Sequence, residues 1–324
     1  MADLSVRAKI ISDIVLIHNR TRRVERRLQN EDYGESELDK PFKYPDFYNA
    51  EIIDMGNFRM EVLKRNNAAI DEWAVLQLHG GGYLSPFRNP YRTLAGLYSE
   101  AARGATVVSV DYRVAPENPY PAAVDDALAA YLWILQAGYL PEKVIFGGDS
   151  AGGGLAMALC HRLKKLGIAL PAGIVAMSPW TDLTTSLPSY KDKFDVDPVF
   201  GNSRSEVIFD NPYPGEENPK NPEISPLYGD FEGFPPMLIQ VGSEEMLYSD
   251  SEAVAAKAKE AGVKVKFSVY EGMFHVFQLS AMLMPESKKA WFEVRRFMDE
   301  ITGQGSSEGE TDEMSETEES GDEG

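Results

Sequence analysis

The stretch Gly148-Asp149-Ser150-Ala151-Gly152 decides the fold. It follows a short apolar segment at 143–146, which we expect to be a strand, and it opens a helical pattern at 151–166. A sharp turn from strand to helix exposes its central side chain at the edge of a sheet. Its flanking residues must be small, because the backbones approach closely there. The pattern makes Ser150 a candidate nucleophile, although five such residues alone also fit a plain tight turn.

A glycine-rich segment offers backbone donors for such a nucleophile. His79-Gly80-Gly81-Gly82 directly follows an apolar segment expected as a strand. Consecutive glycines let the backbone turn its N–H groups toward a developing oxyanion, and each such donor stabilises a transition state by ~3 kcal/mol. Gly80 and Gly81 are the candidate donors, with Ala151 at a helix start as the third. We interpret His79 as structural. The alternative, a phosphate-binding loop, is disfavoured because the P-loop Lys-Ser/Thr and the dinucleotide glycine spacing are absent.

One histidine is placed to act as a general base. Among the four histidines, only His275 lies in a loop beyond the last expected strand, 264–270. An imidazole in that loop can reach a serine at the centre of the sheet edge, and imidazoles exchange protons near neutral pH. His275 is therefore the predicted partner of Ser150.

The base needs a carboxylate that fixes its tautomer, and three acids compete for this role. They follow the expected strand at 237–241 and are Glu244, Glu245 and Asp250. We favour Glu245, because it lies just beyond the strand and before an apolar Met-Leu pair that can turn it inward. Asp250 ranks second, as a residue of the following helix, and Glu244 third.

Strands and helices alternate along most of the chain. Strands are expected at 50–54, 58–64, 74–78, 106–110, 143–146, 173–177, 237–241 and 264–270, and helices at 4–28, 91–103, 122–137, 151–166, 248–261 and 286–301. This alternation predicts an α/β fold with a mostly parallel sheet and helices on both faces. The polar, proline-rich segment 183–226 interrupts it, and we expect a lid there over the carboxyl edge of the sheet.

Composition limits the classes of protein. The 324 residues include 32 basic and 51 acidic ones, a formal charge of −19. Nine of the acids fall in 303–324, which we expect to be a disordered tail, and residues 1–302 keep −10. A nucleic-acid binder is disfavoured, since it needs a basic face. A single cysteine, no apolar run of ~18 residues and no signal-peptide pattern predict a cytoplasmic protein without stable membrane association. A membrane-surface helix at 4–28 is the alternative.

Residues 45–301 resemble the hormone-sensitive lipase family of α/β-hydrolase carboxylesterases. The order of oxyanion loop, serine, acid and histidine matches these hydrolases. The markers are His79-Gly80-Gly81-Gly82, Gly148-Asp149-Ser150-Ala151-Gly152, Asp111-Tyr112-Arg113-Val114-Ala115-Pro116-Glu117, Tyr120-Pro121-Ala122-Ala123, Ser178-Pro179-Trp180-Thr181-Asp182-Leu183 and Gly272-Met273-Phe274-His275. The usual acid site of the family reads Gly-x-x-Asp-x-Leu, and the corresponding residue here is Glu245.

The resemblance implies an α/β-hydrolase catalytic domain at 46–302 and a cap built from 1–45 and 183–226. It also implies ester hydrolysis through an acyl-serine intermediate, without a metal or organic cofactor. We predict a serine carboxylesterase for small, mostly apolar esters or lactones. Aromatic residues that would line its pocket, or else belong to the core, are Tyr83, Phe87, Trp180 and Phe274.

Two other functions are compatible with the same motifs. A ligand-binding receptor on this scaffold is disfavoured, because His275 is present to serve as a base. Another acyl-serine enzyme, an amidase, peptidase or acyltransferase, would use the same triad. The expected partner is a small-molecule ester, and a homo-oligomer is compatible with the sequence.

Overall fold

The computed structural model describes residues 4–20, 34–66, 73–201 and 206–303. Within these residues, eight strands form one sheet in the order β1-β2-β4-β3-β5-β6-β7-β8. β1 and β2 pair antiparallel, as do β2 and β4, and every later pair is parallel. The strands are β1 (Tyr48–Asp54), β2 (Arg59–Arg65), β3 (Ala74–Leu78), β4 (Thr106–Asp111), β5 (Val144–Asp149), β6 (Gly173–Met177), β7 (Met237–Gly242) and β8 (Val265–Tyr270).

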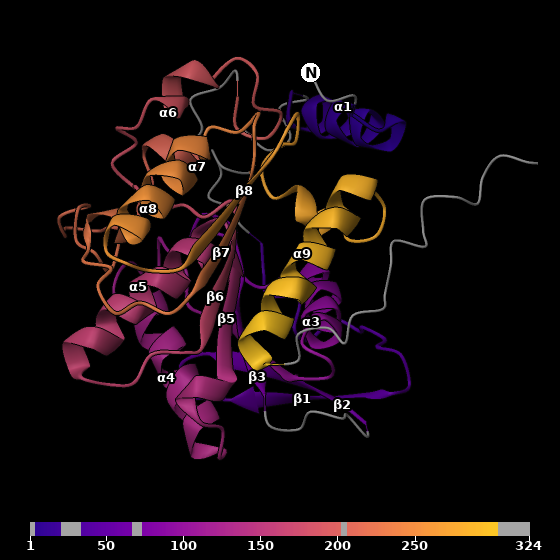
Figure 1. Ribbon diagram of the computed structural model, residues 1–324, viewed down its shortest axis with the longest axis vertical. Helices are drawn as coiled ribbons and strands as arrows, with labels where there is room; N and C mark the ends of the chain where they lie inside the picture. The colour runs from indigo at the N-terminus through magenta and orange to yellow at the C-terminus, as the bar shows by residue number, and fades with distance from the viewer. Residues whose placement is uncertain (1–3, 21–33, 67–72, 202–205, 304–324) are drawn as a thin grey trace, which may run out of the picture.

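Helices cover both faces of this sheet (Figure 1). The helices are α1 (Val6–Arg20), α3 (Asn89–Ala101), α4 (Ala122–Gln136), α5 (Ala151–Leu166), α6 (Ser189–Asp192), α7 (Glu206–Phe209), α8 (Tyr248–Glu260) and α9 (Pro285–Thr302), with 3-10 turns η1 (Pro141–Lys143), η2 (Pro226–Tyr228) and η3 (Phe277–Ser280). Helices α4, α5 and α8 pack on one face and α3 and α9 on the other. The predicted mostly parallel sheet, covered on both sides, is confirmed.

The two hydrophobic cores follow from the alternation of side chains along each strand. In β3, Leu76 and Leu78 face the core beneath α4 and α5, whereas Val75 faces the core beneath α3 and α9. Every residue of β3, β5, β6 and β7 is buried, because helices lie against both faces. The carboxyl ends of these strands meet at one edge, where their following loops come together.

Helices from the two segments expected to form a cap, α1 from one and α6 and α7 from the other, lie beyond that same edge (Figure 1). Figure 1 shows α1 on one side and the short helices α6 and α7 on the other. The N-terminal segment is fastened to the body by Glu286, which accepts hydrogen bonds from the backbone N–H and the hydroxyl of Ser5, both at 2.9 Å. The insertion 183–226 has little regular structure beyond α6 and α7 among its described residues.

Two expectations touch residues that the structure does not describe. The helix expected at 4–28 is seen as α1, which ends at Arg20, and the remainder of that range lies outside the described residues. Nearly all of the acidic tail, 304–324, also lies outside them. In the described part of the chain, no helix is both long and apolar enough to cross a membrane.

Candidate active site

The turn between β5 and α5 holds Ser150 in a strained backbone conformation. Its φ of +51° is uncommon for a residue with a side chain. A β-carbon at Gly152 would overlap the carbonyl oxygen of Leu78, and one at Gly148 would overlap the backbone of Gly152. Only glycine therefore lets the start of α5 approach β3 this closely, as the sequence pattern predicts. The turn is fixed further by a hydrogen bond of 2.9 Å from the backbone N–H of Ser150 to the carbonyl of Met177.

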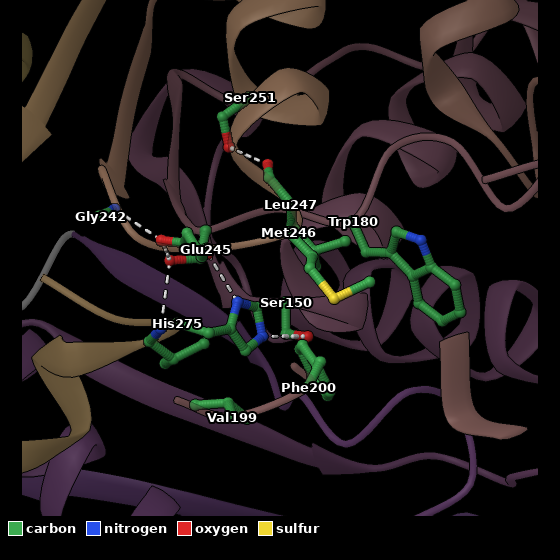
Figure 2. A network of polar contacts seen from close by, with 12 residues as sticks. Ser150, Trp180, Val199, Phe200, Gly242, Glu245, Met246, Leu247, Ser251 and His275 are labelled. Carbon is green, nitrogen blue, oxygen red and sulfur yellow. Dashed lines mark hydrogen bonds and ion pairs between the residues drawn. The ribbon is translucent and has the colours of Figure 1, made fainter. Parts of the chain in front are cut away.

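Three side chains from separate loops form one chain of hydrogen bonds (Figure 2). The Oγ atom of Ser150 lies 2.9 Å from Nε2 of His275, and Nδ1 of His275 lies 2.7 Å from Oε2 of Glu245. Ser150 follows β5, Glu245 follows β7 and His275 follows β8. The structure therefore brings together the three residues that the sequence proposed as nucleophile, acid and base. None of the three is more than 7% exposed, so little water competes for these hydrogen bonds.

The second oxygen of Glu245 is also held. Oε1 accepts a hydrogen bond of 2.8 Å from the hydroxyl of Ser178 and another from the backbone N–H of Gly242. The hydroxyl of Ser178 in turn accepts the backbone N–H of Val276 at 3.2 Å. Ser178 thus joins the loop of the acid to the loop of the histidine. Its motif was recognised in the sequence, but this connecting role was not.

The other two acids are occupied elsewhere. Asp250 is fully buried, and its Oδ1 accepts the backbone N–H groups of Thr181 and Asp182 at 2.9 and 2.8 Å. Burial raises the pKa of Asp250 well above its usual value. Glu244 forms an ion pair with Lys193 at 3.7 Å. Among the three candidates, only Glu245 lies against His275.

The glycine loop after β3 departs from the prediction at Gly80. Its N–H donates to Oδ1 of Asp149 at 3.2 Å, on the buried side of the loop. The expectation that Gly80 supplies an oxyanion donor is therefore corrected, because its N–H already has an internal acceptor. The next two glycines have φ values of +112° and +65°, and the N–H groups of Gly81 and Gly82 make no hydrogen bond to any described residue. Ala151 is the first residue of α5, so its N–H has no acceptor within the helix.

Buried polar side chains brace this loop from beneath. The ring of His79 stacks on Tyr112 with centroids 4.0 Å apart, and its Nδ1 lies 2.7 Å from the carbonyl of Gly80. Burial lowers the pKa of His79 to about 4, so the ring is neutral at physiological pH and serves as a structural residue. Asp149 accepts a second hydrogen bond from the hydroxyl of Tyr91, and burial raises the pKa of Asp149 to about 7.

The four aromatic residues expected at the substrate pocket are all buried in the core, at no more than 4% exposure. Tyr83 and Trp180 belong to the core beneath α4 and α5, Phe87 to the core beneath α3 and α9, and Phe274 to a small cluster near α1. The structure gives them a packing role, and their contact with substrate stays a prediction.

The aromatic ring that faces the catalytic groups was missed in the sequence. The ring of Phe200 packs on the imidazole of His275 with centroids 4.8 Å apart (Figure 2). Phe200 lies in the polar insertion, where no periodic pattern distinguishes it. In the described residues, no group of three or more His, Cys, Asp or Glu side chains is arranged to hold a metal ion.

A mostly parallel α/β sheet, with a serine at the turn after a central strand and a histidine and a carboxylate beside it, defines the class of serine hydrolases with the α/β-hydrolase fold. A family model described as the alpha/beta hydrolase fold matches residues 75–279, and the chain belongs to this family. The resemblance to the hormone-sensitive lipase group of esterases is confirmed by the relatives and solved structures.

The relatives include proteins named as an acetyl-hydrolase and an esterase. An acetyl-hydrolase of Streptomyces hygroscopicus is 36% identical over 255 residues, which are 79% of this chain and 84% of the relative. An esterase of Acinetobacter venetianus is 34% identical over 245 residues, 76% and 80% of the two chains. A crystal structure of an esterase from the bacterial hormone-sensitive lipase family is 35% identical, with a TM-score of 0.81 over 93% of this chain and 99% of that one. The protein is a carboxylic ester hydrolase.

Proposed function

We propose that the protein is a serine carboxylesterase in which Ser150 attacks the ester carbonyl while His275 accepts its proton. Glu245 holds the imidazole in the required tautomer and stabilises the imidazolium that forms. His275 then returns the proton to the leaving alcohol, and an acyl-serine remains. Water, activated by the same imidazole, releases the carboxylic acid. The observation that carries the proposal is the continuous hydrogen-bonded chain from Ser150 to Glu245.

The oxyanion of the tetrahedral intermediate would be bound by three backbone amides. We assign these to Gly81, Gly82 and Ala151, since their N–H groups make no hydrogen bond to the described residues. Gly82 takes the place first given to Gly80. Donors held in position by the fold before reaction need no reorganisation as charge develops on the carbonyl oxygen.

The substrates would be small, mostly apolar carboxylic esters or lactones. Segments 1–45 and 183–226 would form the cap over the site, with the ring of Phe200 beside His275. A short acyl group is consistent with the name of the Streptomyces relative, an acetyl-hydrolase. A cytoplasmic location is part of the proposal, and Cys160, buried in α5, is in keeping with a reducing compartment. A receptor role is not favoured by any contact of the site.

The test is the Ser150→Ala variant, assayed on p-nitrophenyl esters of increasing acyl length. We expect kcat to fall by about 10⁴-fold or more, because the variant lacks the nucleophile and keeps only the backbone N–H groups that bind the oxyanion. The matched control is Ser109→Ala, which removes a buried hydroxyl from β4, where it bonds Gln77. The control should hydrolyse the same esters at the wild-type rate. Turnover by Ser150→Ala at that rate would refute the mechanism, and equal rates on matched amides would favour an amidase.

A further inference from the structure

The insertion touches the glycine loop directly, at a point 129 residues away in sequence. The side-chain amide of Asn211 donates through Nδ2 to the carbonyl oxygen of Gly82 at 2.8 Å. The same nitrogen donates to the carbonyl of Val207 at 2.7 Å, and Oδ1 accepts the backbone N–H of Tyr213 at 2.8 Å. Both hydrogens of the amide group and its oxygen are thus engaged. The amide cannot be turned around, because its oxygen faces an N–H group.

The surrounding contacts make this a rigid support. A β-carbon at Gly82 would lie 2.5 Å from Cγ1 of Val207, so the insertion fills the space that a side chain would take. The ring of Tyr213 stacks on that of Tyr83, the residue after Gly82, with centroids 3.8 Å apart and planes within 4°. The carbonyl of Tyr213 accepts the backbone N–H of Tyr120 at 2.8 Å, which ties this part of the insertion to the body of the protein.

We propose that Asn211 is a positioning residue that orients the Gly82 amide for oxyanion binding. This inference rests on the proposed function, in which Gly82 is one of the three donors. The N–H and the carbonyl of Gly82 are joined through one α-carbon, and glycine leaves both dihedral angles there unusually free. By fixing the carbonyl, Asn211 limits the rotation that would turn the N–H away from the oxyanion. The insertion therefore completes the catalytic site as well as covering it.

The consequence for catalysis is specific. An oxyanion donor stabilises the transition state more than it stabilises the bound substrate. Misplacement of the donor therefore lowers kcat while KM changes little. Displacement of a reacting or stabilising group by about 1 Å lowers the rate by up to about 10²-fold. A residue that only lined the substrate pocket would act mainly through KM.

The test uses the isosteric Asn211→Asp variant of the full chain. One carboxylate oxygen would keep the hydrogen bond from Tyr213, and the other would face the carbonyl oxygens of Gly82 and Val207 with no hydrogen to donate. We expect kcat to fall about 10- to 100-fold, with KM within about twofold. The affinity for a trifluoromethyl ketone, whose serine adduct carries an oxyanion, should fall by the same factor as kcat/KM. Asn218→Asp is the matched control, because Asn218 lies in the same insertion and its side chain bonds only the nearby backbone N–H of Lys220 among the described residues. It should leave all three quantities unchanged.

The outcomes separate this inference from the proposed function. An inactive wild-type protein would end the proposed function, whereas an active wild type with an unaffected Asn211→Asp would end only the inference. A rise in KM with unchanged kcat and unchanged ketone affinity would also overturn it, as would an equal loss in the Asn218→Asp control. If the Asn211→Asp variant does not fold, shown by a lost thermal transition, Asn211→Ala is judged by the same three quantities and the same limits.

Discussion

At the scale of single residues, the acid of the site shows how a glutamate fills a position usually held by aspartate. Its additional methylene extends the carboxylate toward His275, and Ser178 and Gly242 hold the oxygen that does not face the imidazole. The carboxylate is therefore fixed at both oxygens. This matters because a glutamate side chain has one more rotatable bond than an aspartate side chain and must be held in place to orient the histidine.

This arrangement predicts which acid supports catalysis. In Glu245→Gln, the amide oxygen would keep the hydrogen bonds from Ser178 and Gly242, and the amide nitrogen would donate to Nδ1 of His275. The imidazole proton would then lie on Nε2, which could no longer accept the proton of Ser150. We expect kcat to fall about 10³- to 10⁴-fold on a p-nitrophenyl ester. Asp250→Asn keeps the acceptor for Thr181 and Asp182 and should retain kcat close to that of the wild type. The reverse ranking of the two variants would transfer the role to Asp250.

The residue scale also shows what the sequence could predict. Ser150 and His275 could be assigned because each stands in a short motif next to an expected strand, and no other histidine lies beyond the last strand. The choice among three glycines failed at Gly80, since the direction of an N–H group depends on backbone angles, and those depend on Asp149 across the loop. Asn211 and Phe200 could not be found, because their importance arises from contacts between segments distant in sequence.

At the scale of elements, the close approach of α5 to β3 is the feature that positions the nucleophile. Strand and helix alternation predicted both elements, because buried parallel strands are short and continuously apolar. Helices α6 and α7 were not predicted, since each has only four residues and no room for a periodic pattern. Irregular segments of this kind take their shape from the surface on which they lie.

Gly152→Ala tests the importance of this approach. The added methyl group would overlap the carbonyl oxygen of Leu78, and backbone cannot yield as a side chain would. We expect the free energy of unfolding to fall by about 3 kcal/mol or more, measured by urea denaturation. The matched control is Gly96→Ala in α3, where a β-carbon meets nothing within 4 Å. That variant should be about as stable as the wild type or up to ~1 kcal/mol more stable. Equal effects at both positions would contradict this account.

At the scale of the whole molecule, buried ionisable groups link the site to global stability. Burial raises the pKa of Asp149 from 3.8 to about 7, against the lowering effects of the nearby His275 and of the hydrogen bonds from Tyr91 and Gly80. Between these two values the folded protein holds a proton that the unfolded chain has released. The contribution of this carboxyl group to stability is therefore fully present below pH 3.8 and is lost as pH rises through 7.

Asp149→Asn isolates this effect, because the amide keeps an acceptor for Gly80 and does not titrate. The difference in the free energy of unfolding, wild type minus variant, should decrease between about pH 4 and 7 by at most about 1.4 kcal/mol per pH unit. Urea unfolding of both proteins at about pH 5, 6 and 7 measures it. If the difference in the free energy of unfolding stayed constant over this range, Asp149 would be ionised in the folded protein as it is in the unfolded chain.

The hold of Asn211 on Gly82 has a consequence for protein engineering. Exchanging the 183–226 segment with that of a related esterase is an obvious route to new substrate preferences. In this molecule the transplanted segment would also have to supply the hydrogen bond that holds the Gly82 carbonyl. Chimeras without the Asn211 side-chain amide would have a low kcat for every substrate, including substrates that they bind well. Libraries that randomise the segment while retaining Asn211 and Tyr213 should therefore change substrate preference without a general loss of kcat.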